Sequence, residues 1–332
     1  MTPLKNTICL LGIGGPIAFE NLTMFPLIGE DAGRGDYLTL DEALARKLVR
    51  ITEVSESGSV PELRFVNESD RKVLLMDGEE LVGAKQNRTL NISILAAAHS
   101  TLPLPVTCVE AGRWAHASAE FASAERTHYA AGRAQKHASV SNSLNTSGGR
   151  SADQGQVWAD IDAKARRMST TSATHAMAAM YEQNVSSVEQ FVEALPAQAR
   201  QRGALFAIGN EIIGCDLFDS AVTLSKLLPK MVRSYALDAV DRHSAGSGAA
   251  QTPRAADVRA FLDRIAAAET TQFPAIGLGE DVRLQAAGIA GGALVVEDVV
   301  VHLGAFAVAA EPQEAASGAT LSRASQRMRN RI

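Results

Sequence analysis

The stretch between Met76 and Trp114 constrains the fold of this chain more than any other part of the sequence. The apolar run VLLM begins just before this stretch, and the runs LNISIL and LPVTCV lie within it. Their length and composition are typical of β-strands. These runs lead into acids, amides and guanidinium groups, whereas a segment shaped by packing alone would alternate apolar and polar residues and then turn. Polar groups gathered at strand ends indicate a functional site held by a rigid sheet.

The composition describes an ordinary globular protein with an acidic balance. The chain has 332 residues, 46% hydrophobic and 21% charged, which is enough to bury a full core. A net charge of −5 argues against broad nucleic-acid binding, which requires a basic face. The arginine-rich end follows a stretch rich in Ala, Ser and Gly, so residues 311–332 are predicted to form a disordered tail.

The cysteines and the N-terminal region predict a cytoplasmic protein that does not engage a membrane. Cys9, Cys108 and Cys215 are odd in number and widely spaced, which fits a reducing compartment and argues against a disulfide framework. The apolar run ICLLGIGGPIAF is interrupted by glycines and a proline. It is therefore too short to span a bilayer, and it makes a poor signal peptide.

The hydrophobic pattern predicts an α+β fold, a mainly antiparallel sheet with helices concentrated in the middle and C-terminal half. We expect residues 1–310 to form a single domain. It is predicted to be β-rich over 1–114, mobile or lid-like over 115–152, and helix-rich with closing strands over 153–310. In the first part, strands are predicted at 6–11, 17–25, 49–54, 60–67, 71–77, 88–97 and 104–110.

Local signals predict where several elements begin and turn. Thr39 with Glu42 makes a capping box at the start of a helix, and Ser186 with Glu189 makes a second one. Further helices are predicted at 153–168, 220–240 and 252–267, the last opened by Thr252 and Pro253. A hairpin is predicted over 203–218 with its turn at Gly209-Asn210. Closing strands are predicted at 281–290 and 293–306, with a turn at Gly291-Gly292, and are expected to pair with the opening strands.

Two adjacent glutamates follow the predicted turn at Asp77-Gly78. Successive side chains of a strand point to opposite faces, so only one of Glu79 and Glu80 can face a given site. The alternative is a charged strand end that only faces water.

The run from Lys85 to Arg88 is unusually rich in hydrogen-bonding groups. If the strand is unbroken, alternation places Lys85, Asn87 and Asn91 on one side. Two amides and an ammonium group suit a ligand with many oxygens, such as ribose or diphosphate, and Gln86 and Arg88 extend the set. The alternative is a polar turn whose amides cap the local backbone.

The next strand ends in a second polar group. Cys108 and Glu110 share a face, so a thiol nucleophile could meet a carboxylate base, with Lys85 as its electrostatic partner. A lone cysteine in an apolar strand is, however, also typical of an inert core residue. The guanidinium group of Arg113 can donate two hydrogen bonds to a phosphate or carboxylate, and the ring of Trp114 can stack against a base. The alternative there is a partly exposed tryptophan with the arginine packed over it.

Metal ligation by histidine is not expected, because the seven histidines form none of the usual zinc spacings. A magnesium site using Glu79, Glu80 or Glu110 stays open, since hard cations need only oxygen ligands. His302 lies in an apolar run and is interpreted as a satisfied core histidine. Asp216 is expected at a strand end.

Several of these motifs resemble a known family. DGEELVGAKQNR (77–88) and CVEAGRW (108–114) are the most specific, and FPL (25–27), YLTLDEA (37–43), VPEL (60–63), AIGNEIIGCDLFD (207–219) and VVHLGAF (300–306) extend the likeness over nearly the whole chain. Together they resemble the ADP-ribosylglycohydrolase- and rhodanese-phosphatase-associated domain family. The resemblance implies a role in ADP-ribose or NAD-related metabolism, as an enzyme or as a ligand sensor.

The leading hypothesis is therefore a protein that binds a small nucleotide-like ligand related to ADP-ribose and can hydrolyse or transfer part of it. Glu80 or Glu110 would act as general base or hold magnesium. A sensor without turnover and a Cys108-dependent amide or thioester hydrolase are the alternatives, and the oligomeric state is left open. The expected ligand-binding residues are Glu79, Lys85, Gln86, Asn87, Arg88, Asn91, Arg113 and Trp114.

Overall fold

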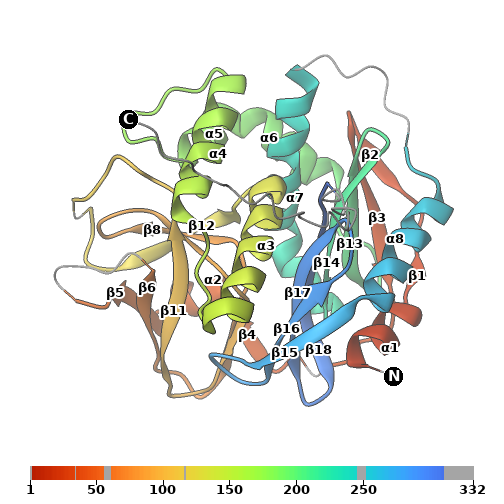
Figure 1. Cartoon of the computed structure of the whole chain (residues 1–332), viewed down its shortest axis with the longest axis horizontal. Coiled ribbons are helices and arrows are strands. Elements are labelled where there is room, and N and C mark those ends of the chain that lie inside the picture. The colour runs from red at the N-terminus through yellow and green to blue at the C-terminus, as the bar shows by residue number, and fades with distance from the viewer. Residues whose placement is uncertain (1, 34, 56–60, 116, 245–251, 310–332) are drawn as a thin grey trace, which may run out of the picture.

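The computed structural model describes residues 2–33, 35–55, 61–115, 117–244 and 252–309 (Figure 1). The architecture is α+β with mostly antiparallel sheets, and its helices fall mainly between residues 130 and 267, which confirms the predicted fold class. A β-rich part and a larger sheet lie on opposite sides of a group of helices (Figure 1). None of the helices in the described ranges is both long and apolar enough to cross a membrane.

The larger sheet has nine strands within the described residues, in the order β1-β3-β13-β14-β18-β17-β16-β15, with β2 paired to β3. The opening and closing strands thus share one sheet, but the β13–β14 hairpin lies between them, so the direct pairing that we expected is wrong. The hairpin turns at Gly209-Asn210 as predicted. The strands are β1 Gly12–Ile13, β2 Ile17–Phe19, β3 Leu22–Ile28, β13 Gln201–Ile208, β14 Glu211–Phe218, β15 Glu269–Pro274, β16 Glu280–Gln285, β17 Ile289–Val296 and β18 Val299–Ala307.

Two smaller sheets form the β-rich part. One runs β12-β8-β9-β11-β6-β5, and the other runs β10-β7-β4, in which β4 and β7 are parallel. Their apolar side chains form a core of their own with the short helix α2. The elements are β4 Tyr37–Thr39, α2 Leu40–Ala45, β5 Val49–Glu53, β6 Glu62–Asn67, β7 Lys72–Leu75, β8 Glu79–Gly83, β9 Arg88–Leu90, β10 Ile94–Ala96, β11 Thr101–Cys108 and β12 Phe121–Thr127.

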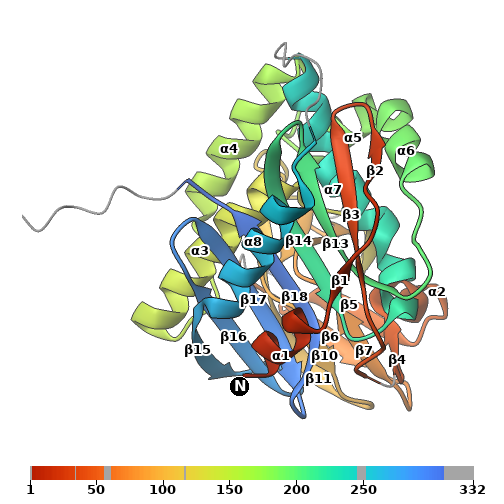
Figure 2. The same ribbon diagram turned by 90° about the vertical axis from the view of Figure 1, so that its right-hand side faces the viewer.

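Helices cover both faces of the nine-stranded sheet (Figure 2). Side chains of α1 and α8 share a core with one face, while those of α7 share a core with the other, to which α3, α4 and α6 also contribute. Helix α3 contacts β14, β17 and β18 and lies between the large sheet and the β-rich part. The helices are α1 Pro3–Cys9, α3 Ala130–Ser147, α4 Gln154–Arg167, α5 Ala178–Gln183, α6 Val185–Ala194, α7 Ala221–Ser244 and α8 Ala255–Ala267.

Several predicted element ends need correction. The expected strand over 6–11 is largely helix α1, because the Thr2 side chain caps it and Pro3 occupies its first turn. The capping box of Thr39 with Glu42 is confirmed, whereas α6 begins after Asn184 and α8 begins at Ala255, later than Thr252-Pro253 suggests. Strand β15 was not predicted.

Gly291 and Gly292 lie inside β17 and do not form the predicted turn. A Cβ at Gly291 would stand 2.6 Å from the Gly304 carbonyl oxygen, and one at Gly292 would stand 1.6 Å from Arg283 Nη2. Glycine is present there because neighbouring groups approach the strand closely.

The segment 115–152, expected to be mobile or lid-like, contains β12 and the whole of α3. Helix α3 has a low amphipathic signal because it buries Arg133, Lys136 and His137 together with alanines. Polar residues on its buried face hide the periodicity that would have predicted a helix. The single domain and the lid-like role stay predictions, and the tail over 311–332 lies outside the described residues.

Candidate functional site

The motif residues gather where three neighbouring strands of the six-stranded sheet end. Glu80 on β8 lies opposite Thr89 on β9, and Arg88 lies opposite Cys108 on β11. The strand expected to run unbroken from 88 to 97 is divided, and residues 84–87 form a turn between β8 and β9. Ala84 has a positive φ of 37°, so alternation does not continue through this turn.

Glu79 and Glu80 point to opposite sides of β8, as the strand period predicts. Glu79 accepts a hydrogen bond of 2.5 Å from Lys230 on α7, whereas Glu80 accepts one of 2.6 Å from Arg126 on β12. Burial raises the pKa of both carboxyl groups, against the lowering effect of these cations. Only Glu80 lies with the other motif residues.

Glu80 and Glu110 belong to one hydrogen-bond chain, which we call the Glu80–Glu110 network (Glu80, Asn87, Glu110, Arg113 and Arg126). The Asn87 amide donates to Glu80 over 3.4 Å and accepts from Arg113 over 3.0 Å, while Arg113 Nη2 lies 2.7 Å from Glu110. Burial acts to raise the pKa of Glu110, but hydrogen bonds from Arg113, Thr174 and the Asn87 backbone outweigh it and lower that pKa. The two carboxyl groups are therefore shifted in opposite directions.

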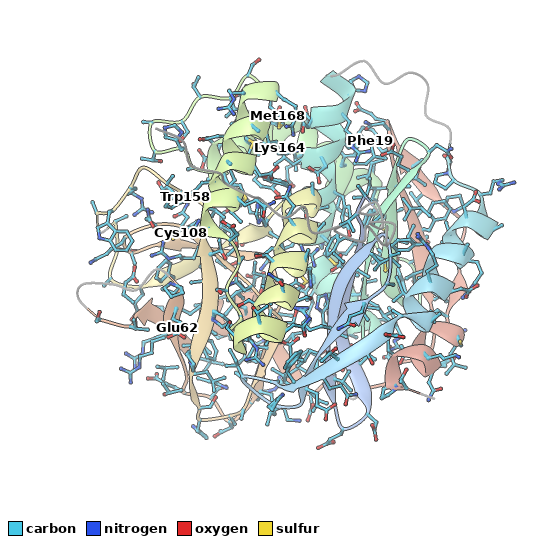
Figure 3. All side chains as sticks on the ribbon, in the orientation of Figure 1. Phe19, Glu62, Cys108, Trp158, Lys164 and Met168 are labelled. Atoms are coloured by element: carbon cyan, nitrogen blue, oxygen red, sulfur yellow. The ribbon has the colours of Figure 1, made fainter. Side chains whose placement is uncertain are left out.

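A second group adjoins this network and is called the Trp114 cluster (Glu53, Lys85, Gln86, Arg88, Cys108 and Trp114). Arg88 Nη1 donates to Gln86 Oε1 over 2.7 Å and to the Cys108 sulfur over 2.5 Å. Cys108 ends β11 (Figure 3). The Gln154 side chain of α4 accepts a hydrogen bond from the Cys108 backbone N–H and donates one to its carbonyl oxygen. Burial raises the pKa of the Cys108 thiol to about 11, so it stays protonated at neutral pH.

Trp114 is the accessible part of this cluster. Its side chain is 48% exposed, whereas Arg88 is fully buried. Lys85 Nζ lies 5.3 Å and Arg88 Cζ lies 5.6 Å from the centroid of its ring. A half-exposed aromatic ring with two cations against it can serve as a stacking surface with positive charge beside it.

Asn91 does not join Asn87. Its amide donates to the Arg150 carbonyl over 2.9 Å and accepts from Thr107 over 2.6 Å. These bonds connect Asn91 to a loop residue and to the neighbouring strand β11, and not to the Trp114 cluster.

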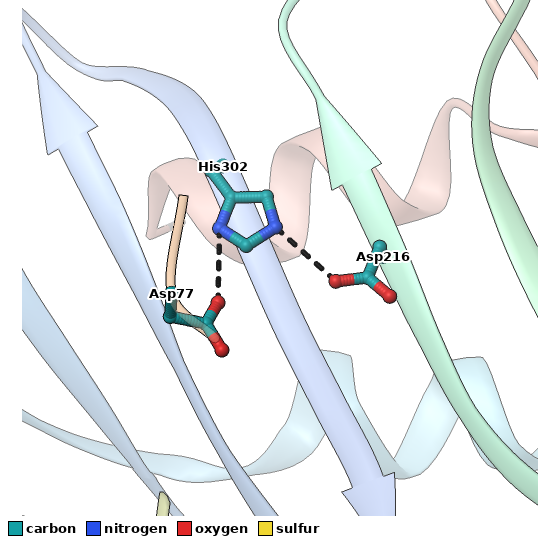
Figure 4. Close-up of side chains that lie close together, drawn as sticks. All are labelled: Asp77, Asp216 and His302. Atoms are coloured by element: carbon teal, nitrogen blue, oxygen red, sulfur yellow. Dashed lines mark hydrogen bonds and ion pairs between the residues drawn. The ribbon is translucent and has the colours of Figure 1, made fainter. Parts of the chain in front are cut away.

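A third charged group, which we call the Arg133 centre (Asp77, Arg133, His137, Asp216 and His302), lies at the junction of the sheets. Arg133 donates to Asp77 through Nε and Nη2, both over 3.2 Å, and to Asp216 through Nη1 over 3.1 Å and Nη2 over 2.6 Å. His302 lies between the two carboxylates, with Nε2 3.2 Å from Asp216 and Nδ1 3.5 Å from Asp77 (Figure 4).

The Arg133 centre is fully buried, and its two carboxylates share the positive charge of Arg133. Burial acts to raise the pKa of Asp77, but the charges of Arg133 and His137 outweigh it and hold that pKa well below its usual range. Asp216 is shifted in the same direction, again mainly by Arg133. Hydrogen bonds within the centre therefore favour two ionised carboxylates around one guanidinium group.

Asp77, Asp216 and His302 can also hold a metal ion, because their ligand atoms lie within 4.8 Å of one another. Within the described residues, this group contains none of Glu79, Glu80 and Glu110, which we considered for magnesium. Arg133 already supplies positive charge to both carboxylates, so a metal would have to compete with it. The expectation that His302 is a satisfied core residue agrees with its bonds to Ser93 and Asp216.

The sequence did not predict the Arg133 centre. Its members come from four distant segments, and two of them lie on α3, within the segment expected to be mobile or lid-like. One signal was available: His302 and Asp216 both interrupt apolar strands, where an ionisable residue usually has a buried partner.

Two adjoining cavities of about 1090 and 450 Å³ share Ala131, Asp238 and Arg242 in their walls, and no residue of the Trp114 cluster lines them. Asp238 accepts from the Ala131 N–H in the first turn of α3, so the positive end of this helix already has a carboxylate. An anionic ligand is therefore disfavoured at that helix end.

Fold and site define a protein of the α+β class that buries ionic networks where two antiparallel sheets meet a layer of helices. The chain belongs to the ARPP-1 family, the ARG and Rhodanese-Phosphatase-superfamily-associated Protein domain, which matches residues 11–306. This match confirms the family that the sequence motifs indicated. Searches of curated proteins and of solved structures gave no match.

Proposed function

We propose that this protein binds an ADP-ribose- or NAD-related nucleotide beside Trp114. The observation that carries the proposal is the half-exposed Trp114 ring with Lys85 and Arg88 against it, at the end of the motif. An aromatic ring of the ligand stacks on Trp114, and the positive charge of Lys85 draws its phosphates to the same place. Arg113 and Asn87, next to these residues in sequence, extend the polar surface.

The Glu80–Glu110 network supports hydrolysis or group transfer as the reaction of this site. Its two carboxyl groups have pKa values shifted apart, raised at Glu80 by burial and lowered at Glu110 by its hydrogen bonds. Two neighbouring carboxyl groups whose pKa values are shifted apart can serve as general acid and general base. Glu80 would then donate the proton and Glu110 would accept one from water.

The ion pairs of the same network favour a sensor without turnover as the second candidate. Glu80 and Glu110 are each already bonded to an arginine, Arg126 and Arg113. A carboxylate held in this way can position a ligand without exchanging a proton. We do not propose a Cys108-dependent hydrolase, because its thiol is buried and its pKa is raised to about 11.

The test is a thermal-shift panel of ADP-ribose, NAD, AMP and ribose phosphates, with and without magnesium, followed by mass spectrometry of each hit. Ligand binding at a hundredfold excess over Kd adds about 2.7 kcal/mol to the free energy of unfolding. Product that disappears in Glu80→Gln and Glu110→Gln, but persists in the exposed-site control Glu62→Gln, supports the enzyme. A shift without product supports the sensor, and no shift from any nucleotide contradicts the proposal.

A further inference from the structure

Arg88 and Glu53 form a buried ion pair whose hydrogen-bonding atoms are largely unused. Arg88 Nη2 lies 3.9 Å from Glu53 Oε1, and the two side chains are 0% and 6% exposed. Neither oxygen of Glu53, nor Nε or Nη2 of Arg88, has a hydrogen-bond partner in the described part of the chain. Buried polar atoms are nearly always hydrogen-bonded, so four unused ones in one pair point to a missing binding partner.

The unused atoms have a defined arrangement. Arg88 Nη1 is occupied by Gln86 and Cys108, which leaves Nε and Nη2 as donors along one edge of the guanidinium plane. Glu53 places an acceptor beside that edge. The pair therefore presents a donor and an acceptor next to each other, both buried.

A planar carboxamide has the complementary arrangement. Its oxygen and nitrogen are separated by about 2.2 Å, given ordinary C=O and C–N bond lengths. Hydrogen bonds of about 2.9 Å can therefore reach Arg88 through the amide oxygen and Glu53 through the amide NH₂. A carboxylate or phosphate would instead set a second negative oxygen against Glu53, which is unfavourable in a buried site.

We propose that Arg88 and Glu53 recognise the carboxamide of a ligand whose aromatic ring stacks on Trp114. This rests on the proposed function and narrows its ligand class to nucleotides with an amide-substituted ring, of which the nicotinamide nucleotides are the example. The four unused atoms are shielded from solvent, and the Trp114 ring lies against Arg88.

The test compares nicotinamide mononucleotide with nicotinic acid mononucleotide, which differ only in carrying an amide or a carboxylate, by isothermal titration calorimetry. The wild-type protein is expected to bind the amide at least tenfold more tightly. Glu53→Gln is expected to bring the two affinities close together, because glutamine can donate to the carboxylate. The control Glu62→Gln changes an exposed glutamate on the neighbouring strand and is expected to keep the preference.

ADP-ribose, which lacks the nicotinamide ring, separates the two proposals. If ADP-ribose binds and the two mononucleotides bind equally, carboxamide recognition is overturned while the proposed function stands. A preference for the amide that persists in Glu53→Gln, with an unchanged melting profile, also overturns it. If no nucleotide binds, both proposals fail.

Discussion

The Arg133 centre and the Trp114 cluster both bury an arginine against acidic side chains, yet their hydrogen bonding differs. Arg133 makes four hydrogen bonds to Asp77 and Asp216, and both carboxylates have further partners. Arg88 faces Glu53 at 3.9 Å, and neither group completes its hydrogen bonds. One group is sealed in the centre of the fold, and the other lies beneath a half-exposed tryptophan.

Burial of charge therefore does not by itself identify a ligand site. A network whose donors and acceptors are matched joins distant elements and stabilises the fold. A pair with unmatched atoms next to an accessible aromatic ring has bonding capacity left for a ligand. We therefore propose a structural role for the Arg133 centre and ligand binding for the Trp114 cluster.

The largest expected effect is that of Arg133→Met. This change leaves Asp77 and Asp216 buried without their cation, which should lower the free energy of unfolding by about 3–5 kcal/mol. Urea denaturation followed by circular dichroism measures the loss. Arg254→Met, which breaks an exposed pair with Asp257, should cause no resolvable change. Equal behaviour of the two variants would show that the centre is not structural.

Trp114→Ala should mainly affect binding. Loss of the stacking surface is expected to weaken nucleotide affinity by about 1–3 kcal/mol, with a smaller effect on stability because the ring is half-exposed. Calorimetric titration with the best ligand of the thermal-shift panel measures it. Trp158→Phe, at the only other tryptophan, should keep wild-type affinity. If Trp114→Ala binds the ligand as tightly as Trp158→Phe does, the ligand lies elsewhere.

Lys136, which adjoins the Arg133 centre on α3, should make stability depend on pH. Burial lowers its pKa from 10.5 to about 7. Between these values the unfolded chain binds more protons than the folded chain. The free energy of unfolding should therefore rise with pH, by at most about 1.4 kcal/mol per unit.

Denaturation at several pH values between 7 and 9.5 measures this slope. Lys136→Met should flatten it, whereas Lys72→Met, at a more exposed lysine paired with Asp36, should leave it unchanged. An identical slope in wild type and Lys136→Met would place the titrating group elsewhere.

The smallest effect is expected from the double change Glu53→Met with Arg88→Met. This ion pair has buried atoms without hydrogen-bond partners. Apolar side chains in its place should therefore leave the free energy of unfolding unchanged or raise it by about 1 kcal/mol. The same urea series measures it. A loss of several kcal/mol would place this pair with the Arg133 centre and remove the contrast between the two regions.

Local chemistry made part of the fold predictable. The capping box of Thr39 with Glu42 and the turn at Gly209-Asn210 depend on residues a few positions apart, and both are present. Helix α3 was missed because Arg133, Lys136 and His137 lie on its buried face, where a sequence pattern leads one to expect apolar residues. The glycines of β17 resembled a turn because close approach by Arg283 requires glycine just as a turn does.

Local patterns in the chain predicted the family, the α+β class and the gathering of polar residues at the ends of β8 and β11. They also predicted that Glu79 and Glu80 face opposite sides, since this follows from the strand period. The tertiary structure decided which charges meet: Arg133 with Asp77 and Asp216, and Arg88 with Glu53. These partners are 35 or more residues apart, and electrostatic pairing depends on distance in space, which no local pattern encodes.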